Sequence, residues 1–154
     1  MKKLKVYLAD LRHIRNGVLF ADTMPLGIGY MKAIIDRDLQ EEVESEIFAY
    51  PDVLREAMIN DTPDVLMVTN YMWNEALSLW YLSFAKKLNP NVLTVMGGPN
   101  IAIEPERQKE FVLNNPQIDI YALGEGDYLA SDILKKYLEN DKNILKLKLS
   151  QEIN

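Results

Sequence analysis

Residues 63–99 read PDVLMVTNYMWNEALSLWYLSFAKKLNPNVLTVMGGP, which is two short apolar runs with a helical pattern between them. The runs at 64–69 (DVLMVT) and 92–96 (VLTVM) are typical of strands that are covered on both faces of a sheet. Between them, one helical stripe is formed by Leu77, Trp80, Tyr81, Phe84 and Leu88. We expect this stripe to be the buried face of a helix that ends at Asn89-Pro90. A strand, helix and strand of these lengths predict a parallel pair.

The same alternation extends outward in both directions along the chain. The further elements predicted, in chain order, are a strand at Leu4–Ala9, a helix at 25–38, a strand at Val43–Tyr50, a short helix from Pro51, a helix at 105–114, a strand at Ile118–Leu123 and a last helix after Gly124–Asp127. The last helix has its own apolar face, made of Leu129, Ile133, Leu134, Tyr137 and Leu138. Five such units predict an α/β, flavodoxin-like (Rossmann-like) three-layer sandwich with a five-stranded parallel sheet in the order 2-1-3-4-5. Ligands of such sheets bind at the carboxyl edge, where the strand order reverses.

Composition limits the kinds of site and partner. The chain has 154 residues, one His, no Cys and a net charge of −6. An acidic chain argues against a nucleic-acid partner, and the lack of Cys excludes thiolate metal sites and iron–sulfur clusters within this chain. No apolar run approaches the roughly 20 residues of a membrane span. The basic N-terminus has no apolar signal core, so we expect a cytoplasmic protein without membrane contact.

The end of the chain departs from the pattern. We expect the α/β domain to occupy residues 1–139, because residues 140–154 (NDKNILKLKLSQEIN) carry no helical stripe. Their alternation, at Ile144, Leu145, Leu147 and Leu149, resembles one isolated strand. A lone strand is not stable. We therefore interpret this segment as a linker or as the start of a domain that is missing here.

Four loops at the predicted carboxyl edge are candidates for ligand binding, and three of them are rich in glycine or unusually long. The long segment from Asp10 to Met24 contains His13, the single His, and is either a mobile polar lid or one wall of the crevice. Gly97-Gly98-Pro99 ends a buried strand, where two missing side chains leave room for a ligand, although a tight turn needs the same residues. Gly124-Glu125-Gly126-Asp127 begins a helix whose amides can receive ligand oxygens, or is simply an acidic helix cap.

The aromatic loop Tyr71-Met72-Trp73-Asn74 follows the third strand, at the predicted reversal of strand order. Exposed aromatic rings beside a crevice suit a large flat ligand. The alternative is a loop that packs onto the following helix.

Several familiar sites are absent from the sequence. A dinucleotide site needs G-x-G-x-x-G after the first strand, and the chain has only Gly17 nearby. No phosphate-binding G-x-x-x-x-G-K-[ST] loop and no G-x-S-x-G elbow is present. Thr69-Asn70 stands where a phosphoacceptor domain of this fold has Asp. The chain therefore is predicted to bind a ligand and not to catalyse a reaction by itself.

In their order along residues 4–138, these landmarks resemble the N-terminal cobalamin-binding domain of radical S-adenosylmethionine (radical SAM) enzymes. The matching pieces are Pro25-Leu26-Gly27 with Tyr30, Pro63-Asp64-Val65, Tyr71-x-Trp73-Asn74, Asn89-Pro90, Gly97-Gly98-Pro99, Pro105-Glu106, Asp119 and Gly124-Glu125-Gly126-Asp127. The resemblance implies a cobalamin cofactor that is presented to a radical SAM domain for methyl transfer or related radical chemistry. The cofactor-binding residues that it implies are Leu26, Gly27, Thr69, Asn70, Tyr71, Met72, Trp73, Gly97, Gly98, Pro99, Gly124, Glu125 and Gly126.

Two departures from related proteins qualify the expected function. Without Cys, the chain cannot hold an iron–sulfur cluster, so the cluster and S-adenosylmethionine are expected only in a missing or separate partner domain. Other cobalamin proteins carry D-x-H-x-x-G after the first strand, but the run from Asp10 through His13 to Gly17 is one residue too long at both gaps. We therefore expect no cobalt ligation by His13. The alternatives are a domain that binds a flavin and a degenerate domain that only mediates protein contact.

Overall fold

The computed structural model describes residues 2–15, 18–20 and 24–151, and its centre is a five-stranded sheet. The strands are β1 (Leu4–Ala9), β4 (Val43–Phe48), β5 (Val65–Thr69), β6 (Leu93–Gly97) and β7 (Ile120–Ala122). Their spatial order is β4-β1-β5-β6-β7, with every neighbouring pair parallel. Counted along the chain, this is the order 2-1-3-4-5, so the predicted flavodoxin-like fold is confirmed.

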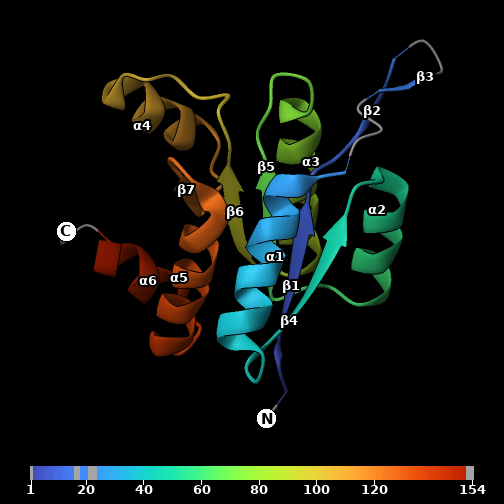
Figure 1. The fold of residues 1–154 in the computed structure, drawn as a ribbon. Helices are drawn as coiled ribbons and strands as arrows, with labels where there is room; N and C mark the ends of the chain where they lie inside the picture. Colours follow the sequence, from blue (N-terminus) through green and yellow to red (C-terminus); the bar gives the residue numbers. More distant parts are fainter. Residues whose placement is uncertain (1, 16–17, 21–23, 152–154) are drawn as a thin grey trace.

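Helices cover both faces of the sheet (Figure 1). On one face lie α1 (Leu26–Leu39) and α5 (Gly126–Glu139), and on the other lie α2 (Pro51–Asn60) and α3 (Glu75–Leu88). The fourth crossover helix, α4 (Pro105–Asn114), has no buried residue and sits beyond the carboxyl end of β6 and β7. Within the described residues, no helix is both long and apolar enough to cross a membrane.

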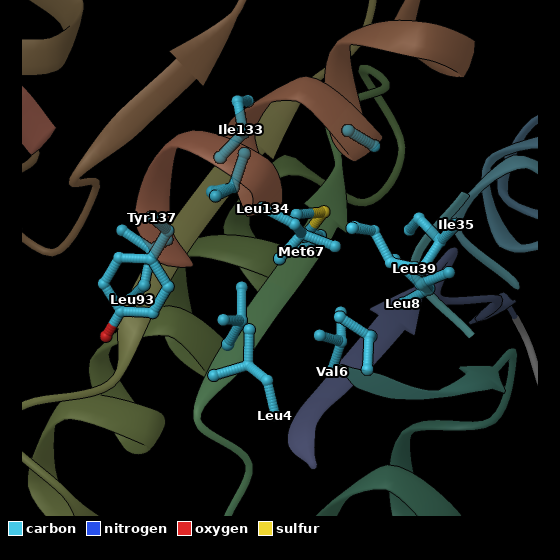
Figure 2. Packing of buried hydrophobic residues seen from close by; sticks show 14 of the residues in the cluster. Leu4, Val6, Leu8, Ile35, Leu39, Met67, Leu93, Ile133, Leu134 and Tyr137 are labelled. Atoms are coloured by element: carbon cyan, nitrogen blue, oxygen red, sulfur yellow. The ribbon is translucent and has the colours of Figure 1, made fainter. Parts of the chain in front are cut away.

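Strand β1 shows why the apolar runs belong to buried strands. Leu4, Val6 and Leu8 face the core under α1 and α5, whereas Tyr7 and Ala9 face the core under α2 and α3. Because both faces are covered, apolar residues occupy successive positions and do not alternate with polar ones. Figure 2 shows the first of these cores, in which the β1 side chains lie beside Met67 and side chains of α1 and α5.

The buried face of α3 is rotated from the predicted one. Its fully buried side chains are Ser78, Tyr81, Leu82 and Ala85. Of the predicted stripe, Tyr81 is buried and Leu77 and Phe84 pack partly buried against the same core, whereas Trp80 is 49% and Leu88 38% exposed. Trp80 stacks on Phe84, with ring centroids 5.1 Å apart. Small residues can form the centre of a buried face because they let the helix approach the sheet closely, and hydropathy alone does not locate them.

Two other segments differ from their predictions. The long segment after β1 contains an antiparallel hairpin, β2 (His13–Arg15) and β3 (Val18–Phe20), which extends away from the sheet (Figure 1). The segment at 140–154, which we interpret from the sequence as a linker or the start of a missing domain, contains helix α6 (Ile144–Gln151), although its apolar residues alternate as in a strand.

Helix α6 attaches to the domain through Ile144, which packs against the α1/α5 core, and through Leu147 and Lys148. Leu147 is fully buried in the α1/α5 core. Lys148 Nζ donates to Asp119 Oδ1 at 2.8 Å, and Lys86 bonds the other carboxylate oxygen. Residues 152–154 lie outside the described part of the chain.

Candidate functional site

A cavity of about 550 Å³ opens at the carboxyl ends of β5, β6 and β7, beneath the first turns of α1 and α5. We call it the first cavity. Parallel strands bring their carboxyl ends to one edge, so the loops after three strands and the start of two helices meet here. The lining residues that carry the argument are Gly27, Ile28, Met67, Thr69, Val95, Gly97, Gly98, Gly124, Gly126, Ala130 and Ile133.

The floor of the first cavity is apolar. It consists of Ile28, Met67, Val95, Ala130 and Ile133, which are all at most 4% exposed. These side chains belong to the core under α1 and α5, so the cavity is a gap between sheet and helices at the end of that core. Such a gap accepts an apolar group at little desolvation cost.

The positions that line the first cavity are occupied by glycine for different structural reasons. Gly98 has a φ of +132°, and a Cβ atom there would lie 2.6 Å from the carbonyl oxygen of Asn70. At Gly97, a Cβ atom would lie 3.2 Å from the Cβ of Ala122. Gly27 has no atom within 4 Å of an added Cβ, so a side chain there would begin in open space at the cavity wall. Gly97 and Gly98 therefore permit close backbone packing, whereas Gly27 widens the opening.

A second cavity of about 280 Å³ adjoins the first, because Asp10, Gly27 and Tyr71 line both. The rings of Tyr71 and Trp73 stack at one wall, with centroids 4.6 Å apart and an angle of 5° between their planes. Arg12 is the basic residue among the described lining residues of the second cavity. We call the two adjoining cavities at the carboxyl edge of the sheet the depression.

The edge of this depression exposes large apolar side chains. Ile103 is 92% exposed and lines the first cavity, while Met24 and Leu26 are 78% and 63% exposed and line the second. Apolar residues gathered at the mouth of a cavity are typical of a surface that a ligand or another protein covers.

A buried amide fixes the aromatic loop. Asn74, 1% exposed, accepts a hydrogen bond from the Tyr71 amide at 2.8 Å and donates to Thr69 Oγ1 at 3.0 Å. Thr69 Oγ1 in turn donates to Asp10 Oδ1 at 2.8 Å. The network joins the ends of β1 and β5 to the start of α3, so it sets where the Tyr71 and Trp73 rings stand.

A second buried network fixes the loop after β6. Asn70 Nδ2 donates to Asn100 O at 2.8 Å and to the Tyr121 hydroxyl at 3.0 Å, and that hydroxyl donates to Gly98 O at 3.0 Å. Burial raises the pKa of Tyr121 above its ordinary value, although the bond from Asn70 opposes the shift, so the hydroxyl stays protonated. The ends of β5, β6 and β7 are thereby held together under the cavity wall.

The predicted cofactor residues fall into three groups. The first cavity is lined by Gly27, Thr69, Tyr71, Gly97, Gly98, Pro99, Gly124 and Gly126. The second cavity adds Leu26 and Trp73. Three predicted residues line neither cavity: Asn70 is fully buried, Met72 is 82% exposed, and Glu125 is the exposed residue before α5. His13 lies on β2 and also lines neither cavity, while Asn16 and Gly17 of its motif lie outside the described residues.

Sequence reasoning missed the residues that come from the middle of an element. Ile133, within α5, is predicted from the sequence only as part of an apolar helix face. Ala130, one turn before Ile133 on α5, gave no signal of its own. The i, i+3 spacing of Ala130 and Ile133 places them on one face of α5, which is a signal once the helix is known to cross the cavity.

The charges of the site are sparse. Among the described residues lining the first cavity, Asp10 and Asp127 are ionisable carboxylates and no Lys or Arg is present. Nowhere in the described part of the chain do three His, Asp or Glu side chains form a group that could hold a metal ion. The lining of the first cavity is therefore mainly apolar side chains and backbone, with Asp10 and Asp127 as its carboxylates.

The protein has a flavodoxin-like fold with a cavity at the carboxyl edge of its sheet, and sequence comparison adds two relatives. No family model matches the chain. It is 28% identical, over 121 residues, to the cobalamin-dependent radical SAM methyltransferase TokK of Streptomyces tokunonensis. It is also 28% identical, over 134 residues, to the 2-(S-pantetheinyl)-carbapenam-3-carboxylate methyltransferase of Streptantibioticus cattleyicolor. The matches cover 76% and 84% of this chain but only 17% and 18% of the relatives, so it spans less than a fifth of their length.

Proposed function

We propose that this chain binds cobalamin and presents it to a radical SAM domain in the same or another polypeptide. The observation that carries the proposal is the first cavity, whose apolar floor and open position at Gly27 fit a thin appendage of a large ligand. Cobalamin has such an appendage, the nucleotide tail, whereas its corrin ring is broad and flat. The similarity to a relative named as cobalamin-dependent supports the same ligand.

Each part of the depression matches a part of that ligand. The tail's base would lie against Met67, Val95 and Ile133, where apolar surface is removed from water. The corrin ring would lie across the second cavity beside the stacked rings of Tyr71 and Trp73. Corrinoid side-chain amides are hydrogen-bond donors, and the Asp10 carboxylate at the boundary of both cavities can accept from them.

The first turn of α5 supplies further hydrogen-bond donors. Gly126 and Asp127 line the first cavity, and no side chain caps this helix start. Uncapped backbone N–H groups at a helix start are suited to the phosphodiester and ribose oxygens of a nucleotide tail. This contact does not need a basic side chain, which agrees with the absence of Lys and Arg among the described lining residues.

In this proposal, the chain itself holds the cobalamin and presents it to the radical SAM domain. Bound cobalamin supplies the methyl-carrying or radical chemistry that methyltransferases of this kind use. An iron–sulfur cluster and S-adenosylmethionine would belong to the partner domain, since this chain has no Cys with which to hold the cluster. The protein around the cavity excludes water from the tail and fixes the orientation of the ring.

Retention of the cofactor tests the proposal. The purified protein is incubated with hydroxocobalamin or with flavin mononucleotide, desalted, and examined by absorption spectroscopy. We expect near-stoichiometric retention of the corrinoid spectrum and loss of the flavin. Retention of flavin alone would contradict the proposal and favour a flavin-binding domain. Retention of neither ligand would favour a domain that only mediates protein contact.

A further inference from the structure

We propose that the first cavity discriminates between corrinoids by their lower base, accepting bases with apolar edges, such as benzimidazoles or phenols, and disfavouring purines. This inference rests on the proposed function, because it concerns the tail of the same ligand. It is carried by the chemistry of the cavity floor and by the hydrogen-bond state of the polar side chains around it.

The floor offers a base no side-chain hydrogen bond. Ile28, Met67, Val95, Ala130 and Ile133 are apolar, and they are contributed by β5, β6, α1 and α5. A purine carries ring nitrogens that accept hydrogen bonds and, in adenine, an amine that donates. Buried without partners, such groups lose their hydrogen bonds to water and weaken binding.

The polar side chains nearer the mouth do not compensate. The hydroxyl of Thr69 donates to Asp10, and Gln108 Nε2 donates to the backbone oxygen of Ala102 at 2.8 Å. Asp10 and Asp127 are acceptors when ionised, so they could receive a hydrogen bond from the adenine amine, but they cannot satisfy the ring nitrogens, which are themselves acceptors. Among the described lining side chains, this leaves Tyr71 as a hydroxyl donor, and it stands at the wall shared with the second cavity.

Benzimidazole and phenol bases present a different surface to the floor. Their inner edges are carbon and methyl groups, which need no partner and gain from leaving water. One unmatched polar group changes binding by about tenfold or more, so the preference should be measurable.

Isothermal titration with four corrinoids tests the inference on the intact protein. The ligands are cobalamin, a p-cresolyl cobamide, an adeninyl cobamide, and cobinamide, which has no base. We expect cobalamin and the cresolyl cobamide to bind within about threefold of each other, and the adeninyl cobamide and cobinamide to bind about tenfold or more weakly. Equal or tighter binding of the adeninyl cobamide overturns the inference, as does equal binding of cobinamide. Failure of all four to bind would instead refute the proposed function.

A hydroxyl introduced into the floor provides a second readout. Val95→Thr changes the shape of the side chain little and adds a donor at the floor, so it should reduce the preference for cobalamin over the adeninyl cobamide by about threefold or more. Val92→Thr is the matched control, because Val92 is fully buried in the core on the opposite face of the sheet. An unchanged preference in a folded Val95→Thr protein contradicts the inference. If this variant does not fold, the four titrations of the wild-type protein still decide whether the first cavity discriminates between lower bases.

Discussion

The backbone of Gly98 lies so close to that of Asn70 that a Cβ atom on Gly98 would stand 2.6 Å from the Asn70 carbonyl oxygen and 2.9 Å from its nitrogen. The two residues follow β6 and β5, and Asn100 N donates to the same carbonyl at 3.2 Å. At one wall of the first cavity, the backbone of Gly98 is therefore supported from behind by the backbone of Asn70. This glycine is required by protein packing, whatever ligand the cavity takes.

Gly98→Ala should accordingly destabilise the fold. Gly98 has a φ of +132°, which residues with a side chain rarely adopt. The added methyl group would also clash with the backbone of Asn70, which cannot move aside. We expect a loss of about 2 kcal/mol or more in the free energy of unfolding. Urea denaturation measures it, with Gly29→Ala in α1 as the control, where no atom lies within 4 Å and stability should rise by up to about 1 kcal/mol. A Gly98→Ala protein as stable as the wild type would contradict this packing.

Gly27 and Gly29 form a matched pair for testing the cavity itself. Both lie in α1 and neither has an atom within 4 Å of an added Cβ, but only Gly27 lines the cavities. Leucine at either position should stabilise the helix by about 0.8 kcal/mol. Gly27→Leu should also weaken hydroxocobalamin binding by about tenfold, because it fills the opening. Gly29→Leu should bind as the wild type does. Equal binding by both variants would show that the ligand does not pass Gly27.

Asn74 should act as a positioning residue for the Tyr71 and Trp73 rings. In Asn74→Ala, the Tyr71 amide and the Thr69 hydroxyl lose their buried partner, so we expect a loss of about 2 kcal/mol in stability. Corrinoid binding should weaken further than this stability loss explains, and the near-ultraviolet circular dichroism of the stacked rings should change. Ser83→Ala is the control on α3, since it removes only a bond to the carbonyl one turn earlier. Unchanged dichroism in a folded Asn74→Ala protein would refute the positioning role.

Asp119 should make stability depend on pH. Burial alone would raise its pKa, but hydrogen bonds from Lys148, Lys86 and the Thr94 amide outweigh burial and lower the pKa below its ordinary value. Since the unfolded chain titrates near pH 3.9, this stabilisation is complete above about pH 4 and is lost as the pH falls through the lower, folded value.

Asp119→Asn tests this dependence by urea denaturation at several pH values. The variant should lose about 2 kcal/mol near neutral pH, and the gap from the wild type should narrow below about pH 4. Asp132→Asn serves as the control, because Asp132 is 60% exposed and its pair with Lys135 spans 3.8 Å. If the difference in free energy of unfolding between wild type and variant widens on acidification, the direction assigned to the pKa shift of Asp119 is wrong.

The sequence was sufficient to predict the sheet, because the strands of this sheet are buried on both faces. Successive apolar residues then mark a strand such as Val65–Thr69 within one residue of its observed bounds. The hairpin from His13 to Phe20 escaped prediction, because two three-residue strands that pair only with each other have no detectable period. Helix α6 was not predicted, because its apolar residues alternate as in a strand, although of Leu145 and Leu147 only Leu147 is buried.

The site, too, could be predicted in part from the sequence. The glycines and aromatic residues at strand ends were found because a parallel sheet gathers those ends at one edge. Asn70, Met72 and Glu125 are sequence neighbours of lining residues, and the direction of each side chain depends on tertiary packing. The floor residues Ala130 and Ile133 could not be recognised, because they become part of a cavity only through the placement of α5 over the sheet.

The apolar side chains at the mouth affect how the unliganded protein should behave in solution. Ile103, Met24 and Leu26 are largely exposed and lie at the mouths of the two cavities, where apolar side chains gather. Without a covering molecule, neighbouring copies can adhere through this edge, so self-association at high concentration is the expected hazard during purification. A bound vitamin would shield part of that surface and act as a solubilising agent as well as a cofactor.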